Sequence, residues 1–414
     1  MHPQRAETAA PIGTIRAVSG TGSTKRGRSR PDAAAPDLAT LVGGAESAGS
    51  DPGPPRRTIA EHWALRTGTG TFLVPARGRR VTVRSLLAYN RLRPPRVRAG
   101  RALAAGAICM GAGSLLATRR RLVAVDDAPT LLDVLASALD EPHLVFAATE
   151  QPGNGFLTPV LQLFTTRGAS VGFAKVGWDE VTRDMIDTEA ATLRKVADAH
   201  WSTVHVPEVA WHGRTHDLAV LITAPMPTRA RRLRGAELPP IEPLHEVGRL
   251  DGPLRRHRLD ASPYWHAVTA AVDAAGQAGL RDDDLVADLE HVAHDHADVE
   301  LDFGRWHGDW VEWNLARAGR QLYAWDWAYS APDVPFGFDL LQFFHLRFHN
   351  REDLPEPVAL DRAATAATPA LARLGVDSAT RAGVVALHRV EVRLRRLRAA
   401  CLRRAVGTGG VATP

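Results

Sequence analysis

The segment RWHGDWVEWNLARAGRQLYAWDW, residues 305–327, places three oxygen-bearing side chains at spacings that suit phosphoryl transfer. Asp309 could take or orient the proton of an acceptor hydroxyl, because this chemistry needs a carboxylate near the attacking oxygen. Asn314 follows five residues later and offers a neutral carbonyl oxygen to Mg²⁺. A hairpin predicted over 315–325 returns Asp326 close to Asn314, so the spacing is that of a metal–nucleotide site.

An aromatic core is the alternative interpretation of this segment. It contains five of the chain's ten tryptophans, and Asp and Asn commonly occupy turns. The rarity of two residue types argues for chemistry, because Asn occurs four times and Lys three times among 414 residues. An Asn at this spacing therefore favours a catalytic loop.

The segment also resembles a known family. HGDWVEWN (307–314) is similar to the HGDxxxxN catalytic loop of the aminoglycoside phosphotransferase and choline-kinase-like enzymes, which share the protein-kinase fold. AWDWAYSAPDVPFGFDL (324–340) resembles the metal-binding segment of the same family. The resemblance implies that Asp309 is the catalytic base and that Asn314 and Asp326 are Mg²⁺ ligands.

Two further residues of the segment take supporting roles by this resemblance. His307 opens the loop motif, and Asp339 matches a structural aspartate at the start of the next helix. Considered alone, Asp339 would be read as a helix N-cap, which is compatible with the family role.

The resemblance implies a phosphate-binding pair upstream. Lys175 lies in a predicted strand and Glu189 follows 14 residues later in a helix predicted over 183–199. In the family such a pair holds the α- and β-phosphates of ATP; the alternatives are a solvent-facing lysine on an edge strand and a glutamate on a solvated helix face. Gly153 and Gly155 lie between two predicted strands and match a phosphate-covering loop weakly, since turn glycines are common.

Strands dominate the sequence before residue 228 and helices dominate after 240, apart from the hairpin, which predicts an α+β fold with two lobes. The resemblance makes this a protein-kinase-like fold with a β-rich N-lobe, an α-helical C-lobe and an N-terminal extension. The predicted parts are a disordered tail (1–57), an extension or subdomain of unknown role (58–140), the N-lobe with its hinge (141–227), the C-lobe (228–406) and a flexible C-terminus (407–414).

Composition limits the other classes. The net charge is +5, but the arginines are read as spread along the chain, so we expect no nucleic-acid binding. Residues 102–118 carry no charge, yet they are too short and glycine-containing for a membrane span and are expected to be packed or buried. Two cysteines provide no disulfide framework and fit a cytoplasmic location.

The sequence therefore predicts an ATP- and Mg²⁺-dependent kinase that phosphorylates a hydroxyl of a small-molecule acceptor. The rival is a catalytically idle, kinase-like nucleotide-binding or scaffold protein that acts through residues 58–140, which could bind a protein partner. An acidic run at 281–302 is expected to be a solvated surface; the alternative is a surface that attracts a cationic substrate.

Overall fold

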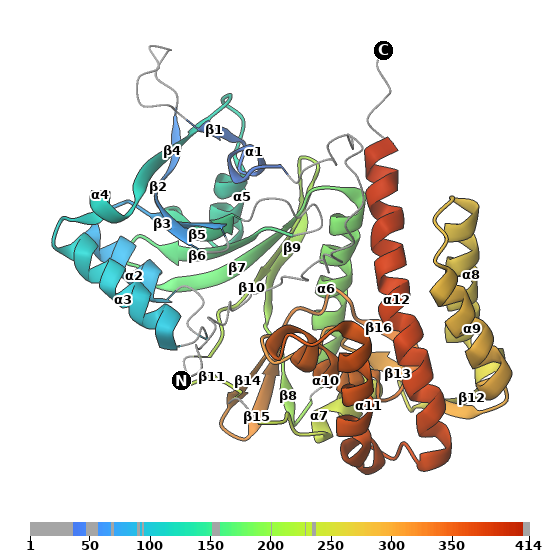
Figure 1. Ribbon diagram of the computed structural model, residues 1–414. Helices are drawn as coiled ribbons and strands as arrows, with labels where there is room; N and C mark the ends of the chain where they lie inside the picture. The colour runs from blue at the N-terminus through green and yellow to red at the C-terminus, as the bar shows by residue number, and fades with distance from the viewer. Residues whose placement is uncertain are drawn as a thin grey trace, which may run out of the picture. The chain divides into compact units, whose positions relative to one another are not determined.

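The chain forms two compact units, one of residues 1–190 with 207–228 and one of residues 191–206 with 229–414. The computed structural model describes residues 36–46, 57–67, 70–88, 92, 95–150, 158–199, 201–227, 229–233 and 237–408, with side chains through residue 401. Strands prevail in the first unit and helices in the second, which confirms the predicted α+β class (Figure 1).

A nine-stranded antiparallel sheet organises the first unit (Figure 1). In sheet order its strands are β1 (Gly44–Glu46), β4 (Thr118–Ala124), β2 (Thr58–Thr67), β3 (Gly70–Pro75), β5 (Leu144–Glu150), β6 (Val160–Thr165), β7 (Ser170–Gly177), β10 (Leu218–Thr223) and β9 (Val209–Thr215). The predicted meander of three strands before residue 178 is confirmed as β5, β6 and β7.

Alternating side chains give this sheet a hydrophobic core on each face. Leu144 and Phe146 of β5 belong to one core, which also contains Leu135 of helix α5 (Leu131–Ala138). Their neighbours Val145 and Ala147 belong to the other core, because successive side chains of a strand point to opposite faces.

Helices cover this sheet through apolar faces of their own. They are α1 (Leu38–Leu41), α2 (Arg79–Ala88), α3 (Pro95–Cys109), α4 (Gly113–Leu116), α5 (Leu131–Ala138) and α6 (Glu180–Asp198), of which residues through Ala190 belong to the first unit. A capping box begins α5, because Thr130 accepts the backbone N–H of Asp133 while Asp133 accepts that of Thr130.

The predicted tail contains a folded portion, so the prediction of disorder through residue 57 is wrong for residues 36–46. These residues form α1 and β1, and β1 pairs with β4. Leu38, Leu41 and Val42 are buried in the core that α5 also contacts. Averaging composition over 57 residues concealed this short apolar cluster, whose burial offsets the entropy of ordering.

Residues 58–140 extend the same sheet, since β3 pairs with β5 and joins β1, β4 and β2 to the meander.

The prediction of a packed segment at 102–118 is only partly right. Ala105 and Ile108 are buried, but Leu103, Met110 and Leu115 are exposed. Within the described part of the chain, no helix is long and apolar enough to cross a membrane.

The second unit consists mainly of helices (Figure 1). They are α7 (Glu242–Gly248), the 3₁₀ helix η1 (Leu259–Ala261), α8 (Pro263–Gln277), α9 (Asp283–His296), α10 (Phe338–Arg351), α11 (Glu356–Arg373) and α12 (Ser378–Thr408). The predicted flexible stretch from residue 407 begins inside α12, and residues 409–414 lie outside the described part of the chain.

Two small sheets complete the second unit, more strand than the sequence predicted there. One contains, in order, β11 (Arg231–Arg232), β14 (Leu315–Ala318), β15 (Gln321–Ala324) and β8 (Val204–His205), and the other contains β12 (Arg255–Arg258), β13 (Glu300–Trp306) and β16 (Ala331–Pro335). The predicted hairpin is confirmed as β14 and β15. The segment between β13 and β14 is the predicted catalytic loop.

Candidate functional site

The loop of residues 307–314 holds its carboxylate and its asparagine in direct contact. Asn314 Nδ2 donates to Asp309 Oδ2 at 2.7 Å and to the Asp309 backbone carbonyl at 3.2 Å. Both acceptors are oxygens, so the amide nitrogen has to face them and Oδ1 has to point away. The short spacing in sequence therefore yields a preformed pair.

The Oδ1 atom of Asn314 fits a metal ligand. It is buried and receives no hydrogen bond from any described residue, although buried polar atoms are nearly always satisfied. An uncharged amide oxygen in this condition suits a hard cation such as Mg²⁺.

The hairpin brings Asp326 back beside this loop. The Trp325 N–H donates to the Asn314 carbonyl at 3.2 Å. Asp326 is the next residue after Trp325, so its backbone lies close to that of Asn314. Asp326 is nearly buried and has a φ of 70°, a left-handed conformation that is uncommon for residues other than glycine. The backbone of Asp326 thus lies next to that of Asn314, the other residue predicted to bind Mg²⁺.

His307 and Asp339 fix the start of the loop. Asp339 accepts the backbone N–H of His307 at 2.7 Å and that of Gly308 at 3.0 Å, one on each carboxylate oxygen. His307 Nδ1 accepts the Asp309 N–H at 3.1 Å and Nε2 lies 3.2 Å from the Trp325 carbonyl, which assigns the proton to Nε2. Burial raises the pKa of Asp339 to about 6, and the two amide donors oppose the increase.

Glycine is required at position 308. Its φ is 81°, and a Cβ there would lie 2.3 Å from the Tyr329 carbonyl oxygen. No other residue fits without moving the backbone of the segment that follows Asp326.

A charged network on α12 supports the loop and was not predicted. Arg395 Nη1 donates to the Gly308 carbonyl at 2.8 Å, and its Nε donates to Glu391 at 3.1 Å. Tyr264 donates to the other oxygen of Glu391 at 3.1 Å, and the Arg395 guanidinium lies 4.3 Å from the centre of the Trp306 ring. Glu391 is the one acid in an arginine-rich helix, which is the signal that could have identified it.

A second unpredicted group acts just before the loop. Arg305 donates to Asp251 at 2.6 Å through Nε and to Ser330 at 3.2 Å. The Ser330 hydroxyl in turn donates to the Trp306 carbonyl at 2.8 Å. These contacts tie the end of β13 to the segment after Asp326.

Lys175 and Glu189 lie together in the first unit. Lys175 Nζ donates to both carboxylate oxygens of Glu189, at 2.6 and 2.9 Å, and both side chains are largely buried. Lys175 lies opposite Val160 of β6 and Leu221 of β10, so its strand is internal to the sheet. The edge-strand alternative for this lysine is therefore wrong.

Other predicted features contribute less. Gly153 and Gly155 lie outside the described residues. Trp310 and Trp327 are fully buried, so the aromatic segment is both a core and the frame of the loop. Among the described residues, no group of three or more His, Cys, Asp or Glu could hold a metal ion; a metal at the loop would rely on the asparagine.

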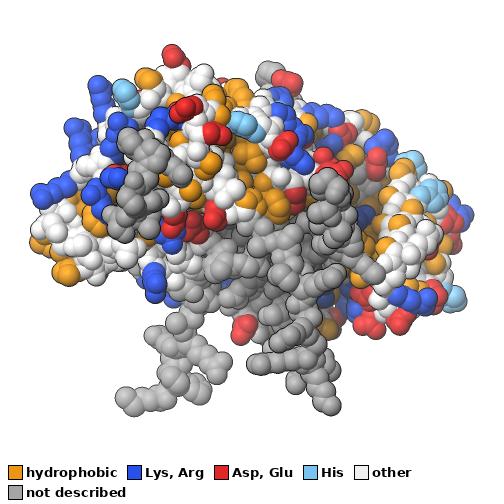
Figure 2. All heavy atoms as spheres, turned by 90° about the horizontal axis from the view of Figure 1, so that it is seen from above, with side chains coloured by type: hydrophobic (Ala, Val, Ile, Leu, Met, Phe, Trp, Pro, Cys, Tyr) orange, Lys and Arg blue, Asp and Glu red, His pale blue; other side chains and the backbone are white. Residues whose placement is uncertain are grey.

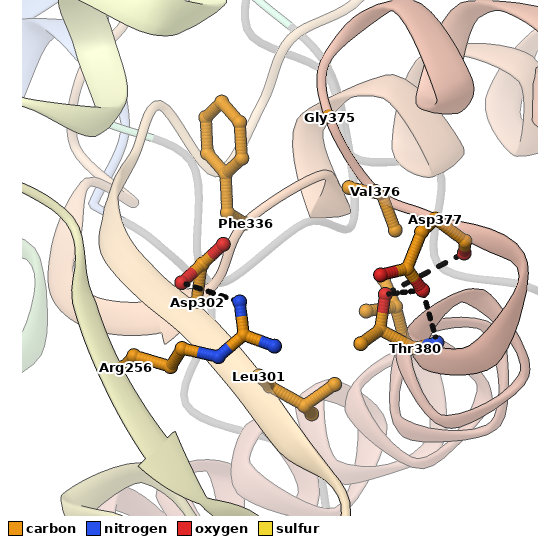
Figure 3. A pocket seen from close by; sticks show the side chains of 9 residues that line it. Arg256, Leu301, Asp302, Phe336, Gly375, Val376, Asp377 and Thr380 are labelled. Atoms are coloured by element: carbon orange, nitrogen blue, oxygen red, sulfur yellow. Dashed lines mark hydrogen bonds and ion pairs between the residues drawn. The ribbon is translucent and has the colours of Figure 1, made fainter.

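A small pocket of the second unit contains none of the predicted site residues. It is lined by side chains that include Arg256, Asp302 and Thr380 (Figure 3). Arg256 faces Asp302 at 3.9 Å, and Asp377 accepts the Thr380 backbone N–H at the start of α12. These charged and polar groups are engaged with one another and suggest no chemistry.

Comparison with known proteins gives a distant structural match. No family model and no curated protein matches the sequence. The structure matches an aminoglycoside phosphotransferase, APH(4)-Ia, in a complex with ADP and hygromycin B, with 13% identity, a TM-score of 0.40, and 68% of this chain and 98% of that one covered. It also matches a type I macrolide 2'-phosphotransferase, with 16% identity, a TM-score of 0.38 and coverage of 69% and 99%. The resemblance to this group of phosphotransferases is therefore a structural match at low sequence identity, over about two thirds of the chain.

Proposed function

We propose that this protein is an ATP- and Mg²⁺-dependent phosphotransferase that transfers the γ-phosphate of ATP to a hydroxyl of a small molecule. The observation that carries the proposal is the Asp309–Asn314 pair. Asn314 Nδ2 donates to Asp309 Oδ2 at 2.7 Å, while Asn314 Oδ1 is buried and receives no hydrogen bond from a described residue. A merely structural turn would have no need for a buried oxygen without a donor.

Asp309 would accept the proton of the acceptor hydroxyl as the new O–P bond forms and the bond to the ADP oxygen breaks. Asn314 fixes this carboxylate by donating to one of its oxygens, and Asp339 and Arg395 fix the backbone on which it stands. Positioning of this kind accounts for much of the catalysis of phosphoryl transfer.

Asn314 Oδ1 and Asp326 would hold Mg²⁺, which supplies charge neutralisation on the phosphate oxygens when bound. In the first unit, Lys175 would donate to the α- and β-phosphate oxygens, and Glu189 keeps its ammonium group in one orientation through two hydrogen bonds. Each assignment rests on a contact recorded within one unit.

The test compares matched variants by calorimetry and by turnover. ATP is titrated with and without Mg²⁺ into the intact protein, Asp326→Asn and Asp353→Asn. Asp353 is exposed and has a φ of 56°, so the control makes the same change at a similar backbone conformation. We expect Mg²⁺-dependent binding that Asp326→Asn weakens and Asp353→Asn leaves unchanged.

Asp309→Asn should retain Mg²⁺-dependent ATP binding, because an asparagine can still accept from Asn314. Its kcat in a screen of aminoglycosides, macrolides and choline-like alcohols should fall on the order of 10²–10⁴-fold, since proton transfer is lost. Full activity of this variant would remove Asp309 as the base. ATP binding that does not depend on Mg²⁺ would favour the alternative of a catalytically idle nucleotide-binding or scaffold protein.

A further inference from the structure

The charge of this chain is concentrated in one stretch. Between His62 and Val125 the sequence contains thirteen arginines and no Lys, Asp or Glu, although the whole chain carries a net charge of +5. The remainder is therefore net acidic, so the net positive charge is concentrated here although 35 of the 48 arginines lie elsewhere in the chain. This stretch includes α2, α3 and α4, of which α3 contacts both α2 and α4 in the first unit (Figure 1).

Several of these arginines are available to an external partner. Arg120 of β4 pairs with Glu46 and Glu150, so that strand is locally compensated. Arg96 and Arg98 of α3 are exposed, and no ion pair with another described residue is recorded for either. At Arg96 and Arg98 the helix thus presents positive charge that no ion pair with a described residue neutralises.

The same helices expose aliphatic side chains. Of the eight large apolar residues that are exposed in the described part of the chain, five lie in or directly beside α2–α4: Leu87, Leu103, Met110, Leu115 and Leu116. Leu103, Met110 and Leu115 are 76%, 80% and 84% exposed, respectively. In Figure 2, basic and hydrophobic side chains gather at the left-hand end, the end where Figure 1 labels α2–α4.

Three exposed residues of α3, Arg96, Leu103 and Met110, share one face. Leu103 and Met110 are seven residues apart, two turns of a helix that still includes Met110 through its N–H bond to Gly106. Arg96 lies seven residues before Leu103 on the same face. The opposite face buries Ala105 and Ile108 against the sheet, whereas Leu103 and Met110 remain exposed.

We propose that α2, α3 and α4 form a docking surface for an anionic lipid bilayer, with arginines contacting phosphate headgroups and Leu103, Met110 and Leu115 entering the acyl boundary. A surface that combines basic and aliphatic side chains without spanning the membrane is typical of interfacial binding. This surface would hold the protein at a membrane reversibly.

The positive charge of the arginines favours an anionic partner. The exposed Leu and Met side chains beside them favour a lipid bilayer over other anionic partners. Surfaces that bind single-stranded nucleic acid use aromatic side chains for stacking, and the sequences of α2, α3 and α4 contain none. Protein interfaces concentrate their binding energy in Trp, Tyr and Arg, whereas leucine is under-represented. Exposed Leu and Met side chains beside arginine instead suit a bilayer, in which acyl chains lie beneath the phosphate headgroups.

Vesicle flotation of the full chain tests the proposal. Vesicles of phosphatidylcholine alone are compared with vesicles that also contain phosphatidylglycerol, at low and high salt. We expect binding only to the second kind, and weaker binding at high salt because the attraction is screened. Equal binding to both kinds, or binding to neither, would overturn the proposal.

Two variants separate the charged and apolar contributions. Arg79→Gln combined with Arg96→Gln and Arg98→Gln should weaken binding by about a hundredfold, at about fivefold for each arginine. The control makes the same charge change at exposed arginines of the second unit, Arg281, Arg320 and Arg373, and should bind like the wild type.

Leu103→Ser with Met110→Ser should weaken binding on the order of tenfold or more, because two apolar side chains would no longer enter the lipid. Its control, Leu238→Ser with Val358→Ser, alters apolar residues that are exposed by 41% and 46% in the second unit. All variants should keep the wild-type melting temperature, since the altered side chains are exposed.

Three results would contradict the lipid surface. One is a serine variant that binds vesicles like the wild type, which would leave only general attraction to polyanions. Another is tighter binding to a double-stranded oligonucleotide than to the vesicles at the same salt. The third is sedimentation velocity showing that the surface mediates self-association, which Leu103→Ser with Met110→Ser abolishes.

Discussion

The protonation of Asp339 makes the stability of the fold depend on pH. Burial raises the pKa of this carboxyl group to about 6, above its ordinary value, so the folded protein holds the proton more tightly than the unfolded chain does. Its contribution to stability is therefore complete below about pH 4 and is lost as the pH rises through about 6, an effect of about 3 kcal/mol.

Asp339→Asn should remove this pH dependence, because an amide does not titrate. Urea unfolding from about pH 4 to about pH 7 should show that the wild type loses about 3 kcal/mol relative to the variant as the pH rises. Asp353→Asn, at an exposed position, controls for the loss of one carboxylate. Parallel curves for wild type and Asp339→Asn would contradict the raised pKa.

At the scale of single contacts, the sequence predicts best what is close along the chain. Asp309 and Asn314 are five residues apart in one loop, and their spacing placed both in one predicted site, although their hydrogen bond was not predicted. Asp339 contacts the His307 amide across 32 residues, and only the resemblance to a family implied its role. The Arg395 contact with the Gly308 carbonyl spans 87 residues and was missed, because a side chain that reaches a distant backbone oxygen leaves no periodic pattern.

At the scale of elements, α12 supports the loop of residues 307–314 through Arg395. We expect Arg395→Met to lower kcat about tenfold or more while the KM for ATP changes by less than about twofold, because misplacing the loop affects the reacting geometry. Arg389→Met is the matched control, since Arg389 lies on the same helix and pairs with Asp361 instead of the loop. Equal kinetics for the two variants would show that Arg395 does not position the loop.

A purely structural role for Arg395 predicts a different result. Its loss leaves Glu391 buried with one donor fewer, which destabilises the fold by about 3 kcal/mol. The double variant Arg395→Met with Glu391→Gln should recover much of this stability. If kcat recovered along with the melting temperature, the effect on activity would be one of stability alone.

Element type was easier to predict than element surroundings. The alternation of apolar residues identified β5, β6 and β7, and helical spacing identified α5 and α6. The uncharged stretch at 102–118 was expected to be packed, because hydropathy does not tell which apolar side chains find a neighbour. In the structure α3 packs through one face, and Leu103 and Met110 lie on the other.

At the scale of the whole molecule, we expect buried histidines to contribute to the loss of stability in acid. Burial, reinforced by His349 and nearby arginines, lowers the pKa of His345 to about 3, and neither ring nitrogen has a hydrogen-bond partner among the described residues. A lowered pKa gives stability that is present above about pH 6.5 and is lost as the pH falls toward about 3.

His345→Leu should therefore flatten the loss of stability in acid and raise stability at neutral pH by about 1 kcal/mol or more, since a buried polar ring without partners is removed. Chemical denaturation at a series of pH values measures both effects. His294→Leu changes a highly exposed histidine and should follow the wild-type curve. A His345→Leu variant as acid-labile as the wild type would place the sensitivity elsewhere, for instance at His62, whose pKa burial lowers to about 4.

The left-handed backbone of Asp326 lowers the stability of the fold, whereas the proposed function requires the aspartate side chain at this position. A left-handed aspartate stores strain of about 1 kcal/mol or more that a glycine at the same position would not carry. A chain selected for thermal endurance alone would thus drift toward glycine at 326 and lose a carboxylate beside Asn314. On the proposed role of Asp326 as a Mg²⁺ ligand, screens that rank variants of this protein by heat resistance would enrich inactive ones at this position, whereas screens for turnover would retain the strained residue.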